Sequence, residues 1–116
     1  MKKLALLLTI VLIFGLSVTA YAASPKLINV MPEMTFSGTT ANCVVAVTGD
    51  YATDDIDVVI KLWRGSTCLR TWYASGEGYV FWDDTATVSK GKTYTLTVDV
   101  TINNTSKPRV SISGTC

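Results

Sequence analysis

The feature that most constrains the fold is a strict alternation of apolar and polar residues along Thr93–Ile102. Its apolar members are Tyr94, Leu96, Val98, Val100 and Ile102. Because successive side chains of a β-strand point to opposite faces, the pattern predicts a strand with one buried and one solvated face. It disfavours an amphipathic helix, whose apolar residues recur every three or four positions.

Weaker versions of this alternation predict further short strands along the chain. They are expected at residues 26–30, 41–48, 56–63, 68–73, 79–82, 85–88 and 109–113. Pro32 is expected to end the first of them, because proline has no N–H to donate to a ladder. Short strands separated by turn residues every ~8–12 positions indicate one all-β domain, folded as an antiparallel two-sheet sandwich.

The first 22 residues have the three-part order of a secretory signal peptide. Lys2 and Lys3 give a positive start, residues 4–20 carry no charge, and Ala-Tyr-Ala at 20–22 offers a small-residue cleavage site. An uncleaved membrane anchor is the alternative, but the apolar run is at the lower edge of the ~17–25 residues that span a bilayer. We therefore expect a signal peptide at 1–22 and a secreted, extracellular domain at 23–116, which meets the membrane only during export.

Charge and composition narrow the classes of function. The chain has 10 Lys+Arg against 9 Asp+Glu, and two of the lysines belong to the leader. Such a balance gives no electrostatic case for binding nucleic acid. The chain also has no histidine, which removes the usual general base and the histidine-containing zinc sites. We expect no catalytic residue, cofactor or metal, and the protein is not predicted to be an enzyme.

Three cysteines, Cys43, Cys68 and Cys116, all lie in the exported part, where oxidation is favoured. Only one bridge can form within a single chain, and three pairings are possible. The expected strand order favours Cys43–Cys116 and places Cys43–Cys68 second. The remaining thiol could join two copies as a disulfide-linked dimer, or be a buried or idle cysteine.

Asp50, Asp54, Asp55 and Asp57 gather around one connection between strands. Carboxylate oxygens at strand junctions suit calcium, although the spacing matches no EF-hand loop. The alternative is a solvated turn, in which aspartate is common because it hydrogen-bonds the local backbone. The sequence leaves open whether the Asp50–Asp57 loop binds calcium.

Aromatic residues crowd the stretch from 63 to 82 and provide the only indication of a binding surface. We take Trp63, Trp72 and Tyr73 as the ligand-binding candidates. Exposed aromatic faces suit a glycan or a protein partner, because they add apolar area at low entropy cost. The alternative is a small apolar cluster that covers the edge of the sandwich.

The stretch 88–98, Val-Ser-Lys-Gly-Lys-Thr-Tyr-Thr-Leu-Thr-Val, resembles the turn and penultimate strand of fibronectin type III and related immunoglobulin-like domains. The resemblance implies that Tyr94 is the corner tyrosine, with its ring in the core and its hydroxyl on nearby backbone. Leu96 stands where true immunoglobulin domains have their second cysteine. The antibody-type disulfide is therefore not implied.

Nearly the whole chain also resembles short secreted proteins of clostridial and related bacteria that have no assigned function. The shared features are a Met-Lys-Lys signal ending in Ala-Ala-Ser and the strand that contains Cys43. They also include the spacing of Trp72, Gly76, Gly78, Val80, Val88, Gly91 and Tyr94. This resemblance implies a bacterial secreted protein and brings no catalytic residues with it.

The sequence thus predicts a secreted, non-catalytic binding or interaction module whose partner is an unknown extracellular protein or glycan. The alternative is a structural component of the cell surface or matrix. In that case copies would assemble through the spare cysteine or through an exposed edge strand.

Overall fold

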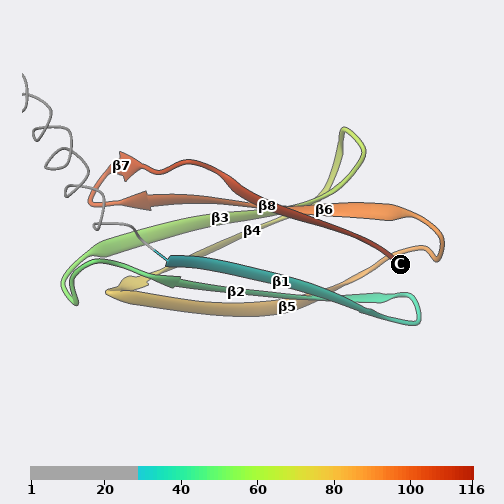
Figure 1. Ribbon diagram of the computed structural model, residues 1–116, viewed down its shortest axis with the longest axis horizontal. Coiled ribbons are helices and arrows are strands. Elements are labelled where there is room, and N and C mark those ends of the chain that lie inside the picture. Colours follow the sequence, from blue (N-terminus) through green and yellow to red (C-terminus); the bar gives the residue numbers. More distant parts are fainter. Residues whose placement is uncertain (1–28) are drawn as a thin grey trace, which may run out of the picture.

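Eight strands follow one another in the computed structural model, which describes residues 29–116 (Figure 1). They are β1 (Asn29–Ser37), β2 (Thr40–Thr48), β3 (Asp55–Arg64), β4 (Thr67–Glu77), β5 (Tyr79–Thr87), β6 (Thr93–Ile102), β7 (Thr105–Ser106) and β8 (Val110–Thr115). No helix in this part of the chain is long and apolar enough to cross a membrane. The predicted signal peptide, residues 1–22, lies outside the described residues, as do positions 26–28 of the first expected strand.

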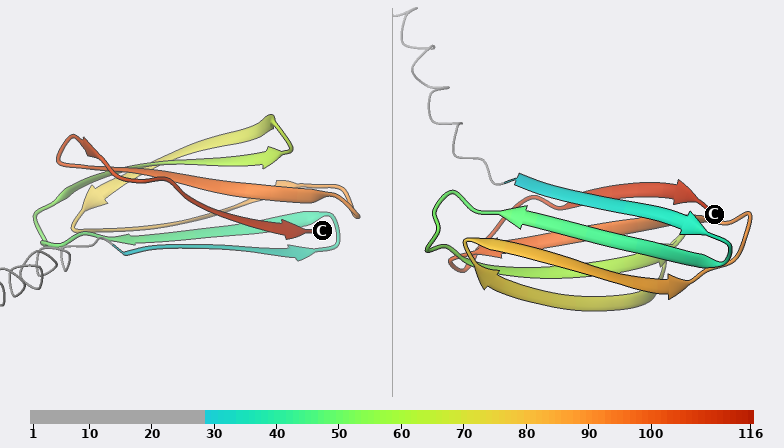
Figure 2. Two further views of the ribbon diagram at one scale, coloured as in Figure 1. Left: turned by 45° about the horizontal axis from the view of Figure 1, so that its top comes forward. Right: turned by 90° about the horizontal axis from the view of Figure 1, so that it is seen from below.

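The strands form two antiparallel sheets that pack face to face (Figure 2). One sheet has the order β1-β2-β5. The other has the order β4-β3-β6, with β7 and β8 both paired to the far side of β6. This arrangement confirms the predicted fold class, an all-β antiparallel two-sheet sandwich.

The core lies between the sheets and consists of alternate residues from the central strands. β6 contributes Tyr94, Leu96, Val98, Val100 and Ile102, β3 contributes Ile56, Val58, Ile60 and Leu62, and β2 contributes Ala41, Cys43, Val45 and Val47. The alternation along Thr93–Ile102 therefore predicted the buried face of β6 correctly. Trp72 and Val80 extend the core toward the side where β4 and β5 lie next to each other.

Tyr94 forms the tyrosine corner that the resemblance implied. Its side chain is 1% exposed, and its ring lies 6.1 Å from the ring of Phe36 in the opposite sheet. Its hydroxyl accepts a 2.7 Å hydrogen bond from the backbone N–H of Ser89. The residue therefore ties the connection that enters β6 to the core beneath it.

Two expected boundaries were wrong. β1 does not end at Pro32 but continues to Ser37, because β1 is an edge strand and a proline there need not break a ladder hydrogen bond. The two short strands expected at 79–82 and 85–88 are one continuous strand, β5, along its whole pairing with β2.

The chain crosses from the five-stranded to the three-stranded sheet at Gly78, between β4 and β5. Gly78 has a φ of +74°, in the left-handed region that side chains with a Cβ rarely adopt. Its N–H donates to the carbonyl of Asp54 at 2.8 Å, and its carbonyl accepts from the N–H of Gly49 at 3.0 Å. The crossing and the loop before β3 therefore hold each other in place.

Candidate binding surfaces

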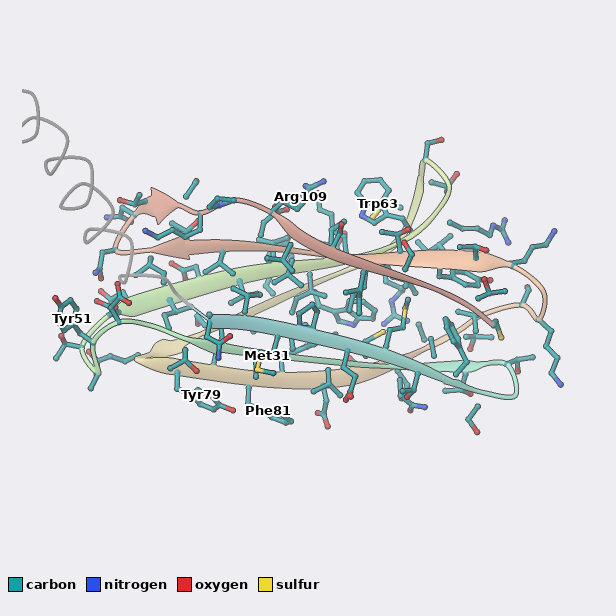
Figure 3. All side chains as sticks on the ribbon, in the orientation of Figure 1. Met31, Tyr51, Trp63, Tyr79, Phe81 and Arg109 are labelled. Carbon is teal, nitrogen blue, oxygen red and sulfur yellow. The ribbon has the colours of Figure 1, made fainter. Side chains whose placement is uncertain are left out.

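Three of the exposed large apolar side chains lie on the outer face of the three-stranded sheet. Met31, Tyr79 and Phe81 are 59%, 52% and 59% exposed, and all three project from this face (Figure 3). Met31 of β1 and Phe81 of β5 are both registered with Ala46 of β2, so they lie in one row across the sheet. Tyr79 is two residues before Phe81 and shares its face. We call these three residues the apolar patch.

An acidic row lies directly beside the apolar patch. Glu33 and Asp83 are both registered with Val44, two residues beyond Met31 and Phe81 and therefore on the same face. The sequences of β1, β2 and β5 contain no lysine or arginine. The outer face of this sheet therefore combines exposed apolar area with negative charge alone.

The apolar patch was not among the sequence-based candidates. Tyr79 and Phe81 alternate with the buried Val80, which indicates that the two share an outward face. The contribution of Met31 could not be foreseen, because it depends on the pairing of β1 and β5 with opposite sides of β2.

Trp63 lies on the outer face of the five-stranded sheet, as predicted. Its indole N–H donates to the Thr97 hydroxyl at 2.9 Å, and the Lys61 ammonium is 5.8 Å from the ring centroid. On the same face, Arg109 forms a two-pronged ion pair with Asp99 at 2.8 Å (Figure 3). This pairing holds the pKa of the Asp99 carboxyl below its usual value. Trp63 is thus a half-buried side chain that already has several polar neighbours.

The predicted grouping of Trp63, Trp72 and Tyr73 was wrong as a single surface. Trp72 points into the core, is 9% exposed, and packs against Trp82 with ring centroids 4.9 Å apart. Tyr73 points outward and is 76% exposed, but it pairs with Val59, whereas Trp63 pairs with Cys68. Four residues of strand, or about 13 Å, separate Tyr73 from Trp63. For Trp72, the alternative to a binding surface is correct, since this residue belongs to an apolar cluster that covers the edge of the sandwich.

The cysteines are unpaired in residues 29–116, so the predicted disulfide is not formed. Cys43 is fully buried between the sheets, and burial, together with the nearby Asp84, raises its thiol pKa to about 11. Cys116 instead donates to the carbonyl of Gly38 in the β1–β2 hairpin, at 3.3 Å. Cys68 is exposed on β4. The favoured pairing failed because the Cys43 thiol points into the core while the Cys116 thiol turns to the hairpin.

The aspartate-rich loop before β3 is organised by Asp54. Its carboxylate accepts hydrogen bonds from the Tyr51 backbone N–H and the Asn103 side-chain amide, each at 3.0 Å. These bonds, with the Tyr51 contribution the largest, lower the pKa of Asp54. Asn103 also accepts from the N–H of Asp55 at 2.9 Å. Residues 29–116 contain no group of three or more metal-ligating side chains that could hold an ion.

Comparisons with known proteins extend only to the fold. No family model matches the sequence, and no curated protein matches it. A β-glucuronidase of Bacteroides uniformis is structurally similar over 76% of this chain, with a TM-score of 0.51 and 11% identity, and this chain covers 13% of that enzyme's length. At this identity the likeness supports the β-sandwich alone.

Two smaller proteins are more distantly similar. The sensor domain of the anti-sigma factor RsgI4 from Pseudobacteroides cellulosolvens matches 78% of this chain and 91% of its own, with a TM-score of 0.47 and 14% identity. CsgH from R. palustris matches 77% of this chain and 92% of its own, with a TM-score of 0.39 and 12% identity.

Proposed function

We propose that this protein is a secreted, non-catalytic binding module that holds a protein partner on the outer face of its three-stranded sheet. The observation that supports the proposal is the apolar patch, in which Met31, Tyr79 and Phe81 are each more than half exposed on one face. Single exposed apolar side chains are ordinary, but a contiguous group marks an interaction surface. Aromatic side chains in such a group supply most of the binding free energy of many interfaces.

The chemistry of the partner follows from the acidic row. Glu33 and Asp83 adjoin the apolar patch, and no basic residue from β1, β2 or β5 balances them. Complementary charge speeds association and selects partners. The partner is therefore a protein surface that carries apolar side chains beside lysine or arginine.

The same proposal includes secretion of the protein and removal of its signal peptide. Residues 1–22 have the order of a signal peptide, and the resemblance to short secreted bacterial proteins supports removal of this leader. The mass of the protein recovered from culture medium tests the point, because cleavage after Ala22 gives a chain that begins at Ala23. A secreted product that retains its leader would contradict this part of the proposal.

The binding surface can be tested with a synthetic peptide library that varies cationic and apolar content independently. We expect retained peptides to be rich in both, and their binding to weaken as salt rises. Phe81→Ser should weaken binding at least about 30-fold, as expected for loss of a central aromatic anchor. Tyr73→Ser is the matched control, since it removes an exposed aromatic from the opposite sheet. Equal losses in the two variants, or retention of neutral peptides, would contradict the proposal.

A second candidate function is assembly of copies through β4. This edge strand has 11 residues, contains no proline, and is paired on one side only within the described chain. Such an edge is a template for strand addition. Cys68 is exposed on the same strand, where it could link two copies covalently. Light scattering under reducing conditions and a non-reducing gel would detect the assembly, and a strict monomer in both would exclude it.

A further inference from the structure

A cleft lies between the sheets, away from the apolar patch. At the end of the sandwich where β5 finishes, this cleft of about 300 Å³ lies between the β3–β4 hairpin and the β5–β6 connection. Leu62, Leu69, Ala86 and Val88 contribute its apolar lining, and Arg64 and Arg70 contribute its charge. This volume is at the lower end of the range for small-molecule sites, and an apolar wall with a few polar groups is typical of them.

The charge of the cleft is unbalanced. No acidic residue lines it. Within residues 29–116 the ion pair is Arg109–Asp99, so neither Arg64 nor Arg70 is paired with a carboxylate there. The cleft is therefore suited to an anion.

The side chain of Arg70 is held in a position to bind an anion. Its guanidinium carbon lies 5.1 Å from the ring centroid of Trp72, which is itself fixed in the core. A guanidinium near an aromatic ring gains cation–π attraction and keeps its N–H groups available for a carboxylate. A donor positioned in this way loses less conformational freedom on binding than a free arginine.

We propose that this cleft binds a small carboxylate with an apolar body, its carboxylate on Arg70 and Arg64 and its body against the wall that Leu69 and the edge of Val88 present. Arginine recognises carboxylates through paired N–H···O bonds, which are stronger than bonds between neutral groups. The apolar lining distinguishes such a ligand from a plain inorganic anion, which has nothing to place there. This site is independent of the proposed function, since the cleft lies between the sheets and the apolar patch lies on the outer face of the three-stranded sheet.

Benzoate, benzyl alcohol and inorganic phosphate are suitable probes, with binding followed by NMR shifts of the methyl groups of Leu62, Leu69 and Val88. We expect benzoate to shift these methyls saturably, and benzyl alcohol and phosphate to bind at least about 10-fold more weakly. Equal binding of benzoate and benzyl alcohol would overturn the role of the arginines. Equal binding of phosphate would overturn the role of the apolar wall.

Arginine variants test which side chains bind the carboxylate of benzoate. Arg70→Gln should weaken benzoate at least about 10-fold, because it removes both the charge and the fork of donors. Arg109→Gln is the matched control, since that arginine lies on the outer sheet face beside Asp99, and it should leave benzoate binding unchanged. If Arg70→Gln does not fold, Arg64→Gln provides the same test at the hairpin. Full binding by a folded Arg70→Gln or Arg64→Gln variant would refute the proposal.

Discussion

Replacing Gly78 with alanine is expected to destabilise the fold far more than the same change at Gly65. Both glycines have positive φ, +74° and +62°, so both substitutions cost about 1 kcal/mol in backbone strain. A Cβ on Gly65 meets nothing within 4 Å. A Cβ on Gly78 would lie 2.7 Å from the backbone oxygen of Ala52 and 2.9 Å from its Cα, closer than real contacts allow.

The backbone must move to relieve this clash, and the movement weakens the two hydrogen bonds that Gly78 makes to Asp54 and Gly49. Each is worth about 1 kcal/mol, so the total loss is about 3 kcal/mol against about 1 kcal/mol for Gly65→Ala. That difference is large beside the ~5–15 kcal/mol that stabilises a typical domain.

Urea unfolding of the wild type and the two variants, followed by tryptophan fluorescence, measures the difference. Thermal melts should agree, with a loss of about 4–8 °C for each kcal/mol in a domain of this size. If the two variants lose the same stability within 0.5 kcal/mol, the close approach of Gly78 to Ala52 does not constrain the fold. The account of the crossing would then be wrong.

Three further outcomes follow from contacts described above. Tyr94→Phe should cost about 1 kcal/mol in urea unfolding because it removes the corner hydrogen bond, whereas Tyr73→Phe, at an exposed site, should cost less than about 0.5 kcal/mol. Because the pKa of Asp54 is held below 3.8, its stabilisation is complete above about pH 4 and is lost as pH falls through that lowered pKa. An Asp54→Asn variant should lack this part of the acid dependence, and a profile as steep as the wild type's would contradict the assignment. Iodoacetamide at pH 8 should alkylate Cys68 in the folded protein and Cys43 only after unfolding, as peptide mass mapping would show, and early labelling of Cys43 would refute its burial.

The parts of the fold that depend on the order of apolar and polar residues within one strand were predictable from the sequence. The alternation along Thr93–Ile102 gave the buried face of β6, and the resemblance of residues 88–98 to fibronectin type III-like domains implied the corner hydrogen bond of Tyr94. β4 lacks such a pattern, since its first five residues are all exposed. A register shift opposite Leu62 and Trp63 further displaces its pairing with β3. The inward direction of Trp72 therefore could not be read from neighbouring residues.

The candidate surfaces depend on strand order, which is a non-local property. The apolar patch requires β1 and β5 to flank β2, so that Met31 and Phe81 meet across Ala46. The arginine cleft requires the β3–β4 hairpin to lie beside the end of β5 in the other sheet. Trp63 was correctly expected to face outward, because alternation within β3 is enough to place its side chain on one face.

The division of the strands between the sheets also determines where the chain tolerates a break. One sheet is made from β1, β2 and β5, and the other from β3, β4, β6, β7 and β8, so the segments of the two sheets are interleaved along the sequence. A cut in the β3–β4 hairpin or at Gly78 leaves neither product with a complete sheet. A cut at 49–54 or 88–92 would keep one sheet whole, but it would disturb the hydrogen bonds that join Gly49 and Asp54 to Gly78, or the one that joins Ser89 to Tyr94. Neither connection is therefore a good place for new termini or for an inserted reporter domain.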